Sequence, residues 1–264
     1  MKHRGFTLIE LLVVIAMVAL LLAILTTVLH SVKRHTKALA CSSRVRTLTL
    51  GMIMYKNKNE AFPYGFTEKS TLPPGGCVGY PNQDRMGWWW LNFLEGYVNK
   101  SKGKISVFNC PSKQLNNLGL RNNILCGNYG VNLSICKNSD YDPNKKEFIG
   151  APLADEDIPN PSRTLLILDS GYSIISWWHA TDIPPVTLNK NNIEDTAYVP
   201  GHKINKEKNL KSGQVYDATN GRHPNRKVNV GFTDGHVVRK KADELSVEKD
   251  AGTYKNKTPL WSPE

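Results

Sequence analysis

The chain has 264 residues, of which 40% are hydrophobic and 22% are charged, and its formal net charge is +11. This length suits a membrane anchor followed by one globular domain of roughly 200 residues. Six Trp, ten Tyr and seven Phe supply large apolar side chains for a core, which excludes a chain disordered along its main length. The basic residues are scattered and form no dense helical stripe, so we expect no nucleic-acid partner. The sequence contains no GxSxG, HExxH or P-loop motif, so we expect neither an enzyme nor a cofactor.

The N-terminal segment, residues 6–29, is apolar and carries one charged residue, Glu10. As a helix it would be about 36 Å long, which is enough to cross a bilayer core of about 30 Å. Lys2 and Arg4 precede it, so the positive-inside rule leaves the first residues in the cytoplasm, although Lys33 and Arg34 follow it. We therefore expect a single pass through the inner membrane, with the rest of the chain periplasmic or otherwise extracytoplasmic.

Glu10 is unusual because an acidic residue at the centre of a membrane helix costs about 2.5–3.5 kcal/mol on insertion scales. Cleavage between Gly5 and Phe6 would create a positively charged amine on Phe6, which could pair with Glu10 of a neighbouring copy. The competing interpretation is a plain membrane anchor that happens to contain one Glu.

The run Gly5-Phe6-Thr7-Leu8-Ile9-Glu10 and the apolar residues after it resemble the N-terminus of type IV pilins and type II secretion pseudopilins. The resemblance covers about twenty residues. It implies a leader peptide of residues 1–5, cleavage after Gly5 by a prepilin peptidase, N-methylation of Phe6 and a role for Glu10 in assembly. The implied partners are the peptidase, other pseudopilin subunits, an inner-membrane assembly platform and membrane lipid.

An amphipathic continuation of the helix follows the membrane segment. Its apolar residues recur at spacings of three and four, which predicts a helix ending near Asn57–Asn59, before Pro63. We expect this stripe to pack on a globular head, as in pilins, and a coiled-coil dimer is the alternative. The stripe consists of Ala38, Cys41, Val45, Leu48, Met52 and Tyr55.

The head, residues 60–248, is expected to contain short strands, so the predicted fold class is α+β: a long N-terminal helix packed on a small antiparallel sheet. The expected strands lie at 107–112, 128–132 and 163–171, followed by a hairpin, 228–238, around Asp234-Gly235. Residues 182–221 are rich in Pro, Asn, Lys and Asp and are expected to form a long loop. Residues 249–264 are expected to form a loose polar tail.

Three adjacent tryptophans, Trp88–Trp90, favour a second function to be weighed against the structural one. Two of the rings are expected in the core and one on the surface or in a groove. If the rings instead formed a sugar-stacking platform, the chain would be a membrane-tethered polysaccharide-binding protein.

Several patches of the head look like a family of pseudopilin-like proteins of planctomycetes and verrucomicrobia. That family has a C-terminal prepilin-type processing-associated motif, in which a His is followed by nine residues and then Asp-Gly. Here ten residues separate His223 from Asp234-Gly235, which indicates one extra residue, placed in the loop 224–227.

His223, Asp169 and Asp234, with His236 nearby, are the best candidates for a metal site, because two carboxylates at strand ends and an imidazole could hold a divalent ion. The structural interpretation, in which these residues only stabilise turns and strand ends, is favoured. The chain also has five cysteines, an odd number without a CxxC motif. If the head is oxidised, Cys41–Cys110 is the preferred disulfide because it would tie the helix to the head, but the pairing is left open.

Overall fold

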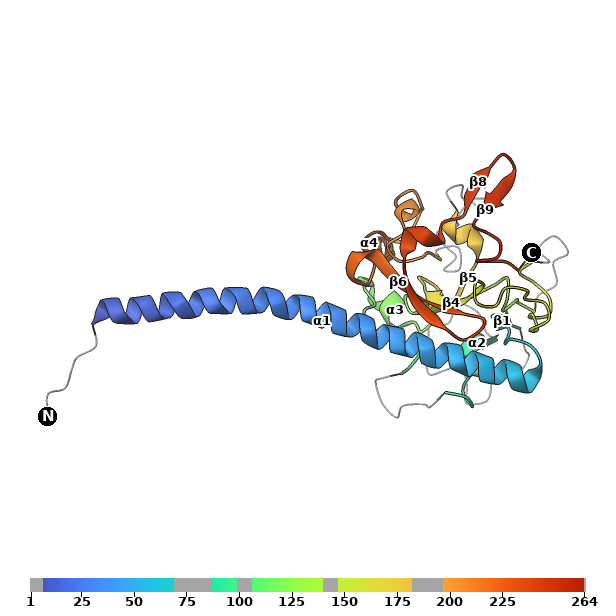
Figure 1. The fold of residues 1–264 in the computed structure, drawn as a ribbon, viewed down its shortest axis with the longest axis horizontal. Coiled ribbons are helices and arrows are strands. Elements are labelled where there is room, and N and C mark those ends of the chain that lie inside the picture. The colour runs from blue at the N-terminus through green and yellow to red at the C-terminus, as the bar shows by residue number, and fades with distance from the viewer. Residues whose placement is uncertain (1–6, 69–86, 99–105, 140–146, 182–196, 264) are drawn as a thin grey trace.

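The computed structural model describes residues 7–68, 87–98, 106–139, 147–181 and 197–263. Helix α1 (Leu8–Asn59) dominates the shape: its first half projects from the head and its second half lies along it (Figure 1). The helix ends at Asn59 as predicted, and Glu60 follows in a left-handed conformation with φ 66°.

The two halves of α1 face different surroundings. The first half holds an apolar window with a mean hydropathy of 3.1, and none of that window is buried, so by length and composition the helix could cross a membrane. From Ala38 onward the predicted stripe is buried, and only Tyr55 of its six residues remains partly exposed. The stripe packs on the head of its own chain, as expected, so its apolar face is already covered within one chain.

The core of the head is a five-stranded sheet in the order β5-β3-β4-β6-β7. The strands are β3 (Tyr129–Asn132), β4 (Leu165–Asp169), β5 (Ile174–Ile175), β6 (Lys227–Phe232) and β7 (Val237–Lys241). Strand β4 is central and entirely buried, because α1 covers it together with β6 and β7. Every pairing is antiparallel except that of β3 with β5, which is parallel. The α+β, pilin-like fold class is thereby confirmed, with a mixed rather than a purely antiparallel sheet.

Gly231 on β6 permits the close approach of α1 to the sheet. A Cβ atom at this position would overlap the hydroxyl of Thr49, which lies on the buried face of the helix. A side chain here would force the helix and the sheet apart.

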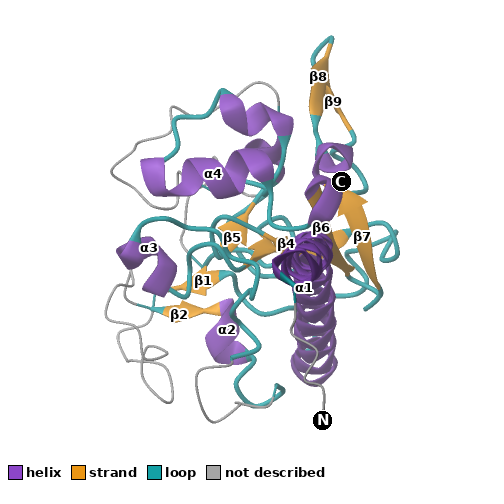
Figure 2. Ribbon diagram, turned by 90° about the vertical axis from the view of Figure 1, so that its left-hand side faces the viewer, coloured by secondary structure: helices purple, strands orange, loops and turns teal. Residues whose placement is uncertain are grey.

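Smaller elements surround the sheet. Two further pairs of strands, β1 (Phe66–Thr67) with β2 (Trp88–Trp89) and β8 (Glu248–Asp250) with β9 (Thr253–Lys255), are antiparallel. In Figure 2, which looks along α1, α3 and α4 lie on one side of that helix and β7 on the other. The short helices are α2 (Trp90–Phe93), α3 (Leu118–Asn122) and α4 (Ser212–Asn220), with 3-10 turns η2 (Trp177–Ala180), η4 (Lys203–Lys206), η5 (Pro224–Arg226) and η6 (Ala242–Leu245).

The strand predicted at 107–112 was wrong, because this segment forms turns. Its backbone finds partners other than a neighbouring strand: the Cys110 N–H donates to the Asn128 side-chain oxygen at 2.9 Å, and Pro111 has no N–H to give. The strands predicted at 128–132 and 163–171 are present as β3 and β4, and the hairpin is present as β6 and β7 with a loop of residues 233–236.

Two expectations of irregular structure also need correction. The described part of the predicted loop, 197–221, contains η4 and the nine-residue helix α4. Residues 249–263 are not a loose tail, because Trp261 is fully buried and its carbonyl accepts a hydrogen bond from the Asn132 side chain at 2.7 Å. The polar composition of this segment gave no indication that Trp261 would attach it to the core.

Candidate functional site

The N-terminus of α1 is closed by a reciprocal pair of residues, Thr7 and Glu10. The backbone N–H and the hydroxyl of Thr7 donate to the Glu10 carboxylate at 2.9 and 2.8 Å, and the Glu10 N–H donates to the Thr7 hydroxyl at 3.3 Å. This arrangement is a capping box, which satisfies backbone donors that the first turn of a helix leaves unpaired.

Glu10 therefore has hydrogen-bond partners within a single chain. Its exposed carboxylate still has room for a cation, since Thr7 supplies neutral donors only. Gly5 and Phe6, the residues at the expected cleavage point, lie outside the described residues. The spacing Thr-x-x-Glu at the start of an apolar run is a known capping signal, and it predicts this cap from the sequence alone.

In the head, the structure brings Cys41 of α1 next to Cys110. Their Sγ atoms are 2.9 Å apart, and both side chains are buried. A disulfide has an S–S distance of about 2.05 Å, and both thiols are free in the structure, so the expected bond remains a prediction. Burial, reinforced by the neighbouring Cys41, raises the pKa of the Cys110 thiol well above its usual value.

His223 lies in the same place and pairs with Asp169 at the end of β4. His223 Nε2 is 3.1 Å from Asp169 Oδ2, and the same oxygen accepts hydrogen bonds from the Asn229 backbone N–H at 2.6 Å and side-chain amide at 2.9 Å. Burial opposes the charge on both groups, but the Asp169 carboxylate outweighs it and raises the pKa of His223. In turn, His223 and Arg222 outweigh burial and lower the pKa of Asp169.

Asp234 does not join this pair, so the proposed set of His223, Asp169 and Asp234 is wrong as a cluster. Strands β4 and β6 are antiparallel, with Leu165 opposite Phe232, so their C-terminal ends lie at opposite ends of the sheet. Four residues of strand separate the two ends by about 14 Å. Asp234 instead contacts His236, with 2.6 Å between Oδ1 and Nδ1, in the β6–β7 loop.

The segment between His223 and β6 contains an irregularity at the place where the extra residue was expected. Asn225 and Arg226 have positive φ values of 60° and 53°, which non-glycine residues seldom adopt. This double left-handed kink lets the chain turn from the buried His223 into β6.

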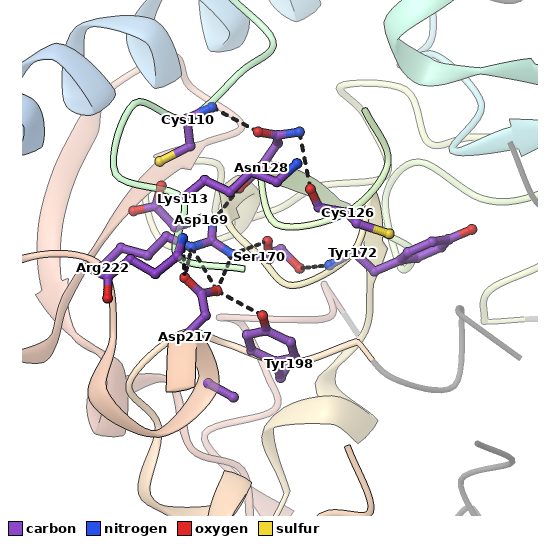
Figure 3. Close-up of polar contacts among 12 residues, drawn as sticks. Cys110, Lys113, Cys126, Asn128, Asp169, Ser170, Tyr172, Tyr198, Asp217 and Arg222 are labelled. Atoms are coloured by element: carbon purple, nitrogen blue, oxygen red, sulfur yellow. Dashed lines mark hydrogen bonds and ion pairs between the residues drawn. The ribbon is translucent and has the colours of Figure 1, made fainter. Parts of the chain in front are cut away.

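A buried ion pair between Arg222 and Asp217 was not predicted from the sequence (Figure 3). Arg222 donates to both oxygens of Asp217 at 2.7–2.9 Å, and to the Asn128 and Ser170 carbonyls at 2.8 Å each. Asp217 also accepts a hydrogen bond from the Tyr198 hydroxyl at 2.8 Å. Because Asp217 sits on α4, inside the stretch interpreted as loop, no sequence signal pointed to this network.

The tryptophan run does not form an exposed platform. Trp89 and Trp90 are buried, and Trp90 Nε1 donates to the Ser173 carbonyl and hydroxyl, while Trp88 is half-buried and its ring centroid lies 5.5 Å from that of Phe93. Two rings in the core and one nearer the surface was the expected division. The stacking surface required by the polysaccharide-binding alternative is absent from Trp89 and Trp90.

Comparison with known protein families identifies the start of the chain. Residues 1–26 match the family of the prokaryotic N-terminal methylation motif. The comparisons with curated proteins and with solved structures found no significant match. The matched motif, the long apolar helix that it opens and the α+β head together support a membrane-anchored protein of the type IV pilin-like or pseudopilin class.

Proposed function

We propose that the chain is a structural subunit, a pseudopilin or minor pilin, of a type II secretion-like or type IV pilus-like assembly. A prepilin peptidase cleaves between Gly5 and Phe6, Phe6 is N-methylated, and the subunit waits in the inner membrane with its head outside the cytoplasm. It then joins other subunits at an inner-membrane assembly platform. The resemblance of the head to the planctomycete and verrucomicrobia proteins, including the His223 to Asp234-Gly235 motif, belongs to the same proposal.

One observation carries this proposal: the methylation motif opens a continuous helix whose second half forms part of the core of the head. A plain anchor needs only a linker between the membrane and its domain. Here the apolar half is exposed in the single chain, while one face of residues 38–56 of the same helix is buried against the head. Such an apolar surface favours lipid first and neighbouring helices after assembly.

N-terminal processing is the first test. The full chain, made in bacterial membranes with a prepilin peptidase, should have a mass that corresponds to a start at methylated Phe6. Gly5→Val, or an inactive peptidase, should leave the leader in place. A chain that keeps Met1 beside an active peptidase would contradict the proposal.

The role of Glu10 in assembly can be separated from its role in capping. Glu10→Gln keeps the side-chain length and an oxygen that can accept the Thr7 hydrogen bonds but removes the charge, whereas Thr7→Val keeps the charge and removes the hydroxyl. If Glu10 pairs with the Phe6 amine of another copy, Glu10→Gln should insert into the membrane at a normal level and yield no filaments, while Thr7→Val should assemble. The opposite pattern would mean that Glu10 acts through the cap alone.

A further inference from the structure

The most chemically unusual place in the head is the junction of Cys41, Cys110 and His223. Each of the three offers one ligand atom, and these atoms all lie within 4.8 Å of one another in a buried setting. They come from three separate parts of the chain: α1, the turns before α3, and the segment that leads into β6. Two sulfurs and one imidazole nitrogen thus converge where the helix meets the sheet.

Unsatisfied polar atoms also gather here. His223 Nδ1, the nitrogen that does not face Asp169, is buried and has no hydrogen-bond partner among the described residues. The hydroxyls of Tyr129 and Ser112 are also buried, and each contacts the Cys41 thiol, which is only a weak hydrogen-bonding group; among the described residues neither hydroxyl has a nitrogen or oxygen partner. Buried polar atoms are nearly always paired in folded proteins, so such a concentration calls for a missing partner.

We propose that Cys41, Cys110 and His223 bind a structural Zn²⁺ ion that fastens helix α1 to the head. Two thiolates and an imidazole are ligands that zinc favours, and closed sites of this kind complete a tetrahedron with a fourth donor. The hydroxyl of Tyr129 or Ser112 supplies an oxygen at the fourth position. Binding releases the two thiol protons, and the Nδ1 proton as well when His223 is protonated, and it leaves the charge of the ion balanced by two thiolates.

The geometry needs only a small adjustment. Bond lengths of about 2.3 Å to sulfur and 2.0–2.1 Å to nitrogen place two tetrahedral sulfur ligands about 3.8 Å apart. The Sγ atoms are 2.9 Å apart, so one thiol has to move outward by about 0.9 Å. A rotation of either short side chain provides this movement.

The surroundings of His223 match those of a metal-bound histidine. Such a histidine usually donates its second ring N–H to a carboxylate, which orients the ring and makes the ligating nitrogen more basic. Asp169 occupies that position on Nε2, and Asn229 holds the carboxylate in place through two hydrogen bonds. Because Nε2 is engaged by Asp169, Nδ1 is the ring nitrogen left to bind a metal ion.

A Cys41–Cys110 disulfide is the competing outcome for the same two thiols. It would also join α1 to the head, and oxidising compartments favour it. It would, however, leave His223 Nδ1 buried and unpaired, and the arrangement of Asp169 behind the ring would have no ligand to orient. The zinc site accounts for all three residues.

The test uses the full chain in mild detergent, purified without a histidine-containing tag. As isolated from the membrane it should contain one zinc per chain and unlinked Cys41 and Cys110. After zinc removal under reducing conditions, Co²⁺ should bind one per chain and produce a thiolate-to-cobalt charge-transfer band. Cys110→Ala and His223→Ala should weaken Co²⁺ binding at least tenfold, and Asp169→Asn should weaken it about 10- to 100-fold.

Cys136→Ala is the matched control, because Cys136 is a fully buried thiol outside the cluster and its loss should leave the Co²⁺ spectrum unchanged. Zinc-free protein with a Cys41–Cys110 disulfide in the isolated chain would overturn the proposal. So would a reduced chain that gives no charge-transfer band, or a band that survives in both Cys110→Ala and His223→Ala. If a variant does not fold, the zinc and free-thiol content of the unaltered chain still tests whether the zinc site exists. None of these readouts involves processing or filament assembly, so they fail independently of the proposed function.

Discussion

Acidification should destabilise the head through His202, the buried residue that caps the 3-10 helix η4. His202 Nδ1 accepts a hydrogen bond from the Ile204 N–H at 3.2 Å, and Nε2 lies 2.9 Å from the Ser246 hydroxyl, which donates onward to the Asp243 carbonyl. This pattern requires a neutral ring with its proton on Nε2. Burial, with the nearby Lys208, lowers the pKa of His202 to about 4.

The direction of the pH effect follows from that lowered pKa. The unfolded chain takes up a proton on this ring near pH 6.5, whereas the folded chain resists protonation until about pH 4. The contribution of His202 to stability is therefore complete above pH 6.5 and is lost as the pH falls toward 4. Between pH 7 and pH 5 the loss from this one group amounts to about 2 kcal/mol.

The assay is urea unfolding of the full chain in detergent, followed by tryptophan fluorescence at several pH values. His202→Gln lowers stability at pH 7 but removes the titrating ring, so its loss of stability from pH 7 to pH 5 should be about 2 kcal/mol smaller than in the unaltered chain. His35→Gln, on an exposed part of α1, is the control for histidine replacement. Equal pH slopes in His202→Gln and the unaltered chain would refute the reasoning.

Three further substitutions probe the packing, each by the same unfolding assay at pH 7. Arg222→Met should cost about 3–5 kcal/mol because it leaves the Asp217 carboxylate buried without its cation, and a loss below about 1 kcal/mol would contradict this. Gly231→Ala should cost about 1–3 kcal/mol through the clash with Thr49, and an unchanged unfolding midpoint would show that α1 can shift freely. Trp261→Ala should cost about 3–5 kcal/mol because the ring is fully buried, whereas the same change in a loose tail would be neutral.

Periodicity made the main elements of the fold predictable. The spacing of Ala38, Cys41 and the later stripe residues identified the packed face of α1, since burying a helix on a surface selects one face. The apolar run at β4 and the alternation through β6 were equally clear. These elements follow from short-range patterns that the three-dimensional environment reinforces.

Long-range contacts decided what periodicity could not. In the turns around Cys110, the Cys110 N–H donates to the Asn128 side chain rather than to a neighbouring strand. Near the C-terminus, the Trp261 carbonyl accepts a hydrogen bond from Asn132 and the ring is buried. Neither partner can be inferred from the local sequence. The first segment was therefore predicted as a strand, and the second as a loose polar tail.

The candidate site shows the same division. The preferred disulfide joined Cys41 and Cys110, and the structure places their Sγ atoms 2.9 Å apart. Cys41 lies on the packed stripe of α1, and Cys110 lies in the part of the head that this stripe contacts. The predicted cluster of His223, Asp169 and Asp234 does not form. The sequence places both carboxylates at strand ends, but it does not show whether those ends lie at the same edge of the sheet. The direction in which paired strands run settled that question in favour of Asp169 and His223.

The continuity of α1 has a mechanical consequence. No glycine or proline interrupts residues 8–50, and the helix runs through Asn59 without a break. A twist applied about the axis near Leu8 is therefore passed to the sheet along an unbroken helix. Sliding the helix along its neighbours by one residue, about 1.5 Å, while keeping the same contacts turns it by about 100°. A shift of the head along the helix axis is therefore coupled to a rotation of the head about that axis.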